Sequence, residues 1–170
     1  FIEYKLSHFN TKTIKRALSK KDILKIINAD CTSQSKLRQL THDLFSFSYL
    51  CGGISFVDIA NLTHQNIVED RLIYQRQKTH GNINLLLSKE ASTIIAKYST
   101  YQQEAEYLFP ILHCKRHITP MQKSNRVHKI CHQVNTELRT FAQELKITAE
   151  VTTYAARHHH LFYTLKISSL

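Results

Sequence analysis

The sequence predicts a mainly α-helical domain that contains one small antiparallel β-sheet. Only 3 glycines and 2 prolines occur among 170 residues, which favours long helices over many short strands. Apolar residues recur at helical spacing along most of the chain, whereas short β-prone runs are confined to residues 66–87. An apolar content of 42% can bury an ordinary core, and this length suits one domain rather than two.

The first element expected is a short helix after a basic linker. Residues 1–18 are weakly patterned and are interpreted as the edge of a missing N-terminal domain, which leaves 19–170 as the domain proper. Ser19 and Asp22 have the spacing of a capping box, and apolar residues at helical spacing follow them.

Two more helices are expected before the β-prone stretch. One runs from Lys36 to about Cys51, where leucines and phenylalanines form an apolar face. Gly52 and Gly53 then break the chain. Ser55 follows as a candidate N-cap for a third, short helix.

The stretch after residue 66 predicts a hairpin or a three-stranded sheet. Its β-prone runs are 67–68, 72–74 and 83–87. Polar residues at 69–70 and at 79–82 separate them and are typical of turns.

The second half of the chain returns to helices. One is expected to begin near Lys89, and a loop that contains both prolines follows it. The clearest helical pattern covers 124–146. Its apolar stripe consists of Val127, Ile130, Cys131, Val134, Leu138, Phe141 and Leu145. Thr152 and Thr153 are candidate caps for a last helix.

The charge of the chain favours a polyanionic partner. Lys and Arg number 23 against 13 Asp and Glu, a net charge of +10. Such a surplus points first to nucleic acid and second to an anionic membrane surface, although a generically basic protein has the same balance. No apolar run reaches the roughly 18 residues that a membrane span needs, so no spanning segment is expected.

The cysteines and histidines do not predict a metal or a cofactor. The four cysteines are widely spaced without a CxxC pair, which favours reduced thiols over disulfides. His128 and His132 have the spacing that binds one metal ion, and Cys114 offers a further ligand. Because no zinc signature is present, histidines on the wet face of a helix are the preferred interpretation.

Three segments, taken together, resemble the catalytic domain of tyrosine recombinases of the phage-integrase family, in the branch found in Bacteroides-type mobile elements. They are 43–62 (DLFSFSYLCGGISFVDIANL), 71–81 (RLIYQRQKTHG) and 152–158 (TTYAARH), with an opening RALS at 16–19. The resemblance covers most of residues 16–160. It implies the α+β fold of that domain, in an incomplete form.

The resemblance also implies a reaction and two catalytic residues. The family cuts one DNA strand with a tyrosine hydroxyl and forms a 3′-phosphotyrosyl link. Arg157 matches the second catalytic arginine, whose guanidinium fork can grip two phosphate oxygens. Lys78 matches the hairpin lysine, which gives a proton to the leaving 5′-oxygen.

Two positions depart from the family pattern. Ser55 stands where the first catalytic arginine is expected, so one phosphate clamp is lost unless another cation fills its place. Arg76 and Arg116 are the candidates for that cation and, with His158, for DNA contacts. Tyr154 stands at the position of the histidine in His-x-x-Arg, where its hydroxyl can donate a hydrogen bond to phosphate but is a poor base.

The end of the chain departs from the pattern as well. Only thirteen residues follow Arg157, and the family nucleophile comes tens of residues later. Tyr163 is too close to Arg157 to take that role, so no nucleophile is assigned within this chain.

The sequence therefore predicts the DNA-binding catalytic domain of a site-specific recombinase. The alternative is a non-catalytic DNA-binding remnant that regulates an intact recombinase. The partners expected are double-stranded DNA and intact recombinase subunits, and no membrane. The isolated chain is expected to be a monomer in the bacterial cytoplasm, at the nucleoid.

Overall fold

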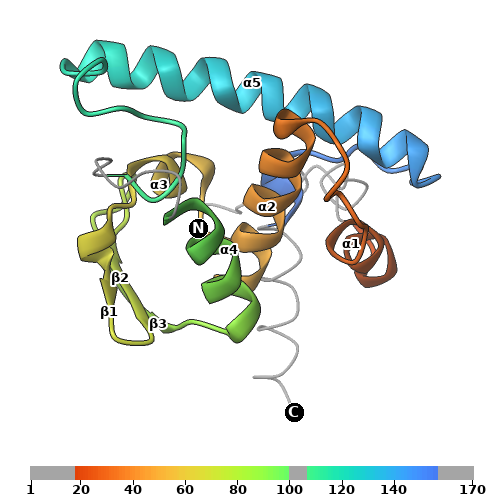
Figure 1. The fold of residues 1–170 in the computed structure, drawn as a ribbon, viewed down its shortest axis with the longest axis horizontal. Coiled ribbons are helices and arrows are strands. Elements are labelled where there is room, and N and C mark those ends of the chain that lie inside the picture. Colours follow the sequence, from red (N-terminus) through yellow and green to blue (C-terminus); the bar gives the residue numbers. More distant parts are fainter. Residues whose placement is uncertain (1–17, 100–106, 157–170) are drawn as a thin grey trace, which may run out of the picture.

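The computed structural model describes residues 18–99 and 107–156, and these form helices around one small sheet (Figure 1). The predicted fold class, mainly α with a small antiparallel sheet, is confirmed. The elements are α1 (Lys20–Ile27), α2 (Lys36–Leu50), α3 (Phe56–Asn61), the 3-10 turn η2 (His64–Asn66), β1 (Ile67–Val68), β2 (Arg71–Gln75), β3 (Asn82–Leu86), α4 (Lys89–Ser99) and α5 (Pro120–Glu144). Residues 153–156 form a further helical turn.

Helix α2 is the central element of the fold. It contacts α1, α3, α4 and α5, and α5 runs across one end of these helices (Figure 1). Because neighbours cover it on several sides, α2 buries polar as well as apolar side chains. The sheet lies on the α3 and α4 side of α2, away from α1 (Figure 1).

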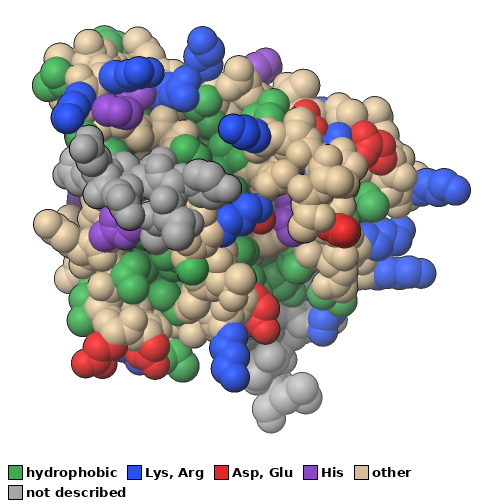
Figure 2. All heavy atoms as spheres, viewed as in Figure 1, with side chains coloured by type: hydrophobic (Ala, Val, Ile, Leu, Met, Phe, Trp, Pro, Cys, Tyr) green, Lys and Arg blue, Asp and Glu red, His purple; other side chains and the backbone are tan. Residues whose placement is uncertain are grey.

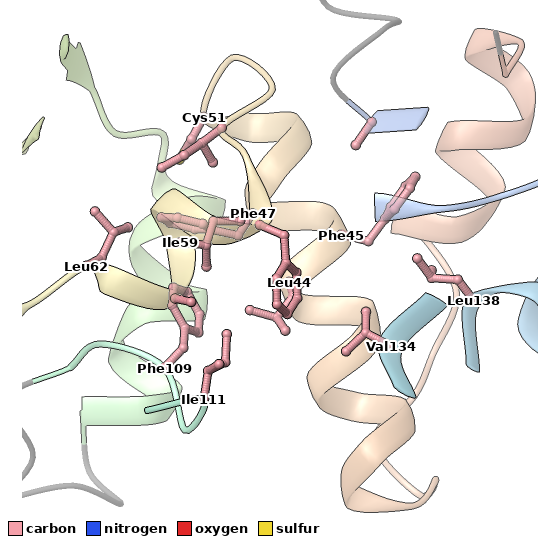
Figure 3. Close-up of a cluster of buried hydrophobic side chains, with 14 of the residues drawn as sticks. Leu44, Phe45, Phe47, Cys51, Ile59, Leu62, Phe109, Ile111, Val134 and Leu138 are labelled. Atoms are coloured by element: carbon pink, nitrogen blue, oxygen red, sulfur yellow. The ribbon is translucent and has the colours of Figure 1, made fainter. Parts of the chain in front are cut away.

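Phenylalanines and aliphatic side chains together fill the core between α2, α3 and the segment that follows α4 (Figure 3). Phe47 and Phe109 pack edge to face with ring centroids 5.0 Å apart, and the Tyr98 and Phe109 ring centroids lie 5.4 Å apart. Burying one such ring stabilises the fold by roughly 1.5–3 kcal/mol. The core therefore joins α2 to a segment about a third of the chain length later.

Two predicted local features, the cap of α1 and the glycine break after α2, are confirmed. The Ser19 hydroxyl accepts the backbone N–H of Asp22 and caps α1. Gly52 and Gly53 have φ of 71° and 75°, a left-handed conformation that glycine adopts without strain, and they end α2.

The three β-prone runs form one antiparallel sheet in the order β1-β2-β3, as predicted. Leu72 pairs with Ile67 on one side and with Leu85 on the other, and it is fully buried. Residues 76–81 form the turn between β2 and β3. This turn, the β2–β3 turn, contains Lys78.

Helix α5 begins four residues earlier than the predicted start at residue 124. Thr119 and Gln122 form a reciprocal capping box, and Pro120 occupies the first helical turn. Proline fits there because its missing N–H would have no partner within the helix. The prediction placed Pro120 in the loop because it weighed proline as a helix breaker.

All four cysteines are free thiols, as the spacing predicted. Cys31 and Cys51 are buried, whereas Cys114 and Cys131 are partly exposed. Burial raises the pKa of Cys51 to about 12, so this thiol stays protonated and unreactive at neutral pH.

A buried arginine joins α2 to α5. The Arg38 guanidinium donates to Glu137 through Nε and to both carboxylate oxygens of Glu144, at 2.6 and 2.9 Å. It also lies 4.6 Å from the centre of the Phe141 ring. The carboxylates raise the pKa of Arg38 further above its usual range, so it stays charged although only 7% of the residue is exposed.

A buried carboxylate joins α2 to α4. One oxygen of Asp43 accepts from the Lys97 ammonium at 2.6 Å and from the Tyr98 hydroxyl at 2.7 Å, and the other lies 3.3 Å from His42 Nδ1. Burial on its own raises the pKa of Asp43, but the bonds from His42, Lys97 and Tyr98 outweigh it and hold the pKa below its usual value.

Asp43→Asn is expected to lower the free energy of unfolding by about 1–3 kcal/mol at neutral pH, because the amide cannot replace the charged acceptor. The folded-state pKa lies below the unfolded value of about 3.9, so the contribution of the carboxylate is present above that value and is lost as the pH falls through the folded pKa. Urea unfolding at about pH 7 and about pH 2.5 measures this. A difference between the two proteins that does not shrink in acid would contradict it.

Candidate functional site

Ser55, where the resemblance led us to expect an arginine, caps helix α3. Its hydroxyl accepts the backbone N–H of Asp58 at 3.2 Å and donates to the Asp58 carboxylate at 2.6 Å. The predicted N-cap is therefore confirmed. Because a hydroxyl has only one proton to donate, and Asp58 receives it, Ser55 holds the start of α3 rather than replacing the cation of an arginine.

Asp58 ties this helix start to the β2–β3 turn. Its second carboxylate oxygen accepts the backbone N–H of Gln77, the residue before Lys78, at 2.9 Å. The carboxylate is buried and satisfied by both partners. The role of Asp58 was not predicted, although Asp58 follows Ser55 at the same spacing as Asp22 follows Ser19.

The β2–β3 turn carries two cations. The Arg76 N–H donates to the Gly81 carbonyl oxygen at 3.0 Å, and the His80 N–H donates to the Arg76 carbonyl oxygen at 2.9 Å, so the backbone of the turn is closed on both sides. Lys78 is exposed at the tip. The exposed Lys78 side chain therefore projects from a backbone that these hydrogen bonds hold in place.

The Arg76 side chain interacts with Tyr74 of β2. Burial raises the pKa of the Tyr74 hydroxyl, and a hydrogen bond from Arg76 offsets only part of that rise. Arg76 is half-buried and directly follows β2, so it places a cation at the start of the β2–β3 turn.

Tyr154 and Ser55 line one small surface pocket. The pocket has a volume of about 120 Å³, and α3 and the turn at 153–156 form its walls. Its lining residues are Ile54, Ser55, Phe56, Val57, Thr153 and Tyr154. Tyr154 is 59% exposed, so it lines the pocket from an exposed position. Two positions about 100 residues apart, which the sequence analysis assigned to one site, thus lie side by side.

Two of the predicted positions, Arg157 and His158, lie outside the described residues, as does Tyr163, to which the sequence assigned no role. The described chain ends with Ala155 and Ala156, which are both buried. The roles of Arg157 and His158 therefore stay predictions.

Arg116 belongs to a second, strongly basic surface, formed by the turn 113–117 and the N-terminal half of α5. Residues 107–136 contain five Lys and Arg and four His, but no Asp or Glu. In Figure 2, Lys, Arg and His side chains gather over the N-terminal end of α5. The surface offers several cations to a polyanion without an opposing charge.

Two imidazoles close the turn of this surface. His117 Nδ1 accepts the backbone N–H of His113 at 2.9 Å, and His113 Nδ1 accepts that of Lys115 at 3.1 Å. Burial, together with the charges of Arg126, His113 and Arg116, lowers the pKa of His117. Arg116 is exposed at this turn, on an element other than those that carry Ser55, Arg76 and Lys78.

The described residues contain neither a metal cluster nor a helix fit to span a membrane. Within residues 18–99 and 107–156, no three His, Cys, Asp or Glu side chains are placed to hold a metal ion. No helix in the same ranges combines the length and the apolar character that a membrane span requires.

No protein-family model matches the sequence, and no curated protein matches it. Solved structures do match. Lambda integrase (residues 75–356) bound to DNA matches with a TM-score of 0.58 at 15% identity, over 91% of this chain and 53% of that chain. XerA recombinase matches with 0.57 at 15% identity, over 89% and 51%. The lambda integrase catalytic core matches with 0.56 at 16% identity, over 90% and 85%.

These matches concern the fold of the chain. It spans about half the length of the XerA and DNA-bound lambda integrase chains, but most of the separate catalytic core. At this level of identity the likeness concerns the fold. The described helices and the small antiparallel sheet have the fold of the lambda integrase catalytic core.

Proposed function

We propose that this chain is the DNA-binding catalytic domain of a site-specific tyrosine recombinase of a bacterial mobile element. In the intact enzyme it holds one backbone phosphodiester while a tyrosine hydroxyl attacks it. The observation that carries the proposal is the pairing of Ser55 with Tyr154 around one pocket. Asp58 joins the same helix start to the turn that presents Lys78.

The proposed roles follow from charge and proton chemistry. The attacked phosphate gains negative charge in the transition state, so fixed cations beside it accelerate the reaction. Lys78 is the proton donor to the leaving 5′-oxygen, and Arg157 is a phosphate clamp. The Tyr154 hydroxyl orients a phosphate oxygen. DNA is the proposed substrate class, because the similar structures include lambda integrase bound to DNA.

Arg76 is the proposed replacement for the missing first arginine. Arg76 is half-buried in the turn that Asp58 holds through the backbone N–H of Gln77, and Asp58 is hydrogen-bonded to Ser55. Arg116 sits on the basic surface before α5 and is assigned to contacts with DNA further along the duplex. Arg76 is therefore assigned to the reacting phosphate, whereas Arg116 is assigned to the affinity for duplex DNA.

A second candidate function rests on Ser55. Its only hydroxyl proton is committed to Asp58, so this position itself supplies no charge to a phosphate. A chain without that clamp could act as a non-catalytic DNA-binding regulator of an intact recombinase. Both functions require DNA binding, and only the first requires strand cleavage by the complete gene product.

The chain is expected to bind duplex DNA with an affinity that falls steeply with salt. Each Lys or Arg that contacts a phosphate contributes about −0.9 to the slope of log K against log salt concentration. Arg116→Ala is therefore expected to make the slope less steep by about 1 and to weaken binding to all sequences alike. Fluorescence anisotropy with a labelled duplex, from about 50 mM salt upward, measures both quantities.

Lys21→Ala is the matched control. Lys21 is exposed on α1, on the other side of α2 from the sheet, so its loss removes the same charge from a surface with no proposed role. An unchanged slope for Arg116→Ala would remove the basic surface from the proposal. Absence of binding at about 50 mM salt would overturn any role in DNA recombination.

A further inference from the structure

The helical turn at 153–156 is held at its first residue by a side chain of α5. Asn135 Oδ1 accepts the backbone N–H of Thr153 at 2.9 Å. The amide nitrogen of the same side chain donates to Cys131 Sγ at 3.6 Å, and Cys131 Sγ lies 3.9 Å from the Thr153 hydroxyl. Asn135, Cys131 and Thr153 thus form one cluster, which we name the Asn135 latch.

The latch provides an acceptor that the turn itself does not supply. The first N–H groups of a helix have no partner within it, and a capping side chain just before the helix usually accepts one of them. Here the acceptor for Thr153 comes from another helix, 18 residues earlier in the chain. The hydrogen bond from the Asn135 amide nitrogen to Cys131 Sγ orients the amide so that its oxygen points at the turn.

The latch acts on the side chain that enters the candidate site. Val151, Ala155 and Ala156 are buried against the core, which fixes the depth of this segment. Packing of these three apolar side chains would still allow the segment to shift along α5. The hydrogen bond of 2.9 Å from Thr153 to Asn135 fixes its position, because a hydrogen bond requires a defined distance and angle. Tyr154 follows the latched residue and lines the pocket with Ser55. Arg157 follows Ala156 directly in the chain.

We propose that Asn135 is a positioning residue for the phosphate site, which sets the register of the 153–156 turn against α3. The proposal rests on the proposed function, because it assumes that this turn contributes to phosphate binding. Asn135 itself does not touch the DNA. It acts through the placement of Tyr154.

Four variants of the full chain test this role. Asn135→Leu removes the acceptor, and Asn135→Asp keeps it. Gln133→Leu and Gln133→Asp make the same changes at an exposed position of α5. Hydrogen exchange of the Thr153–Ala156 amides reports the latch directly. Duplex affinity and its salt slope report the site, and urea unfolding reports global stability.

Asn135→Leu is expected to speed exchange of the Thr153 amide by about tenfold and to weaken DNA binding by up to about tenfold. The salt slope is expected to stay unchanged, because Tyr154 carries no charge. Asn135→Asp is expected to keep the exchange of the wild-type chain and to bind DNA as Gln133→Asp does, since both add the same charge to the same helix. Rescue by the aspartate separates a lost acceptor from a disturbed core.

Three results would overturn the proposal. Unchanged exchange at Thr153 in Asn135→Leu means that the latch does not hold the turn. Faster exchange with the DNA affinity of Gln133→Leu means that Asn135 has a structural role only, while the proposed function stands. A wild-type chain that fails to bind duplex DNA overturns the proposed function and this role with it.

Discussion

Replacing Lys78 with alanine is expected to slow DNA strand cleavage by the complete gene product by about 10²–10⁴-fold, the range that one proton-transfer partner contributes. Asp58 accepts the N–H of Gln77, and the closed turn fixes the backbone from which Lys78 projects. Affinity for duplex DNA is expected to change little, because Lys78 is assigned to the leaving oxygen and the basic surface that carries Arg116 is unchanged. The defect thus lies in the chemical step.

Two further measurements separate proton donation from charge. Lys78→Arg keeps the positive charge, but a guanidinium does not release its proton at a working pH, so cleavage is expected to stay slow. A substrate with sulfur in place of the leaving 5′-oxygen needs no proton donor, because a thiolate leaves far more readily than an alkoxide. This substrate is expected to restore cleavage by Lys78→Ala.

Lys21→Ala again provides the control for charge, and it is expected to cleave at the parental rate. Cleavage by Lys78→Ala at the parental rate would remove Lys78 from the site. Slow cleavage of the sulfur substrate would assign Lys78 to phosphate binding rather than to the leaving group.

Most of the fold could be predicted because its signals are local. Ser19 caps α1 and Ser55 caps α3 through the third residue that follows each of them, and the two glycines at 52–53 end α2. The β-prone runs needed no partner from a distant part of the chain, since the three strands pair with their sequence neighbours. Each of these elements is determined within a few residues.

The interactions between distant elements could not be predicted. Arg38 resembles a surface residue of an amphipathic helix, and its burial depends on Glu137 and Glu144, which lie 99 and 106 positions later. Asn135 resembles a polar residue on the wet face of α5, and only the fold brings Thr153 to it. No spacing rule links such pairs.

The candidate site could be predicted only in part. Ser55, Lys78 and Tyr154 came from a resemblance to a family, and the described structure brings Ser55 to Tyr154. Asp58 connects Ser55 to the β2–β3 turn, but nothing in the sequence indicated this role. The resemblance identified positions, whereas the hydrogen bonds that hold those positions appeared only in three dimensions.

Arg38→Ala is expected to lower the free energy of unfolding by about 3–5 kcal/mol, the range seen when one partner of a buried ion pair is removed. Glu137 is 21% exposed and loses its cation, and Phe141 loses the guanidinium that packs over its ring. Glu144 is 55% exposed and is solvated by water, which places the effect toward the lower end. Urea unfolding of both proteins, with the slope against urea compared, measures the change.

The double variant Arg38→Met with Glu137→Leu shows whether the loss comes from the uncompensated carboxylate. It leaves no charge in the contact between α2 and α5 except the exposed Glu144, so it is expected to recover much of the stability lost in Arg38→Ala. Arg139→Ala, at an exposed position of α5, is expected to change stability by less than about 0.5 kcal/mol. Equal stabilities for Arg38→Ala and Arg139→Ala would mean that hydrophobic packing alone joins α2 to α5.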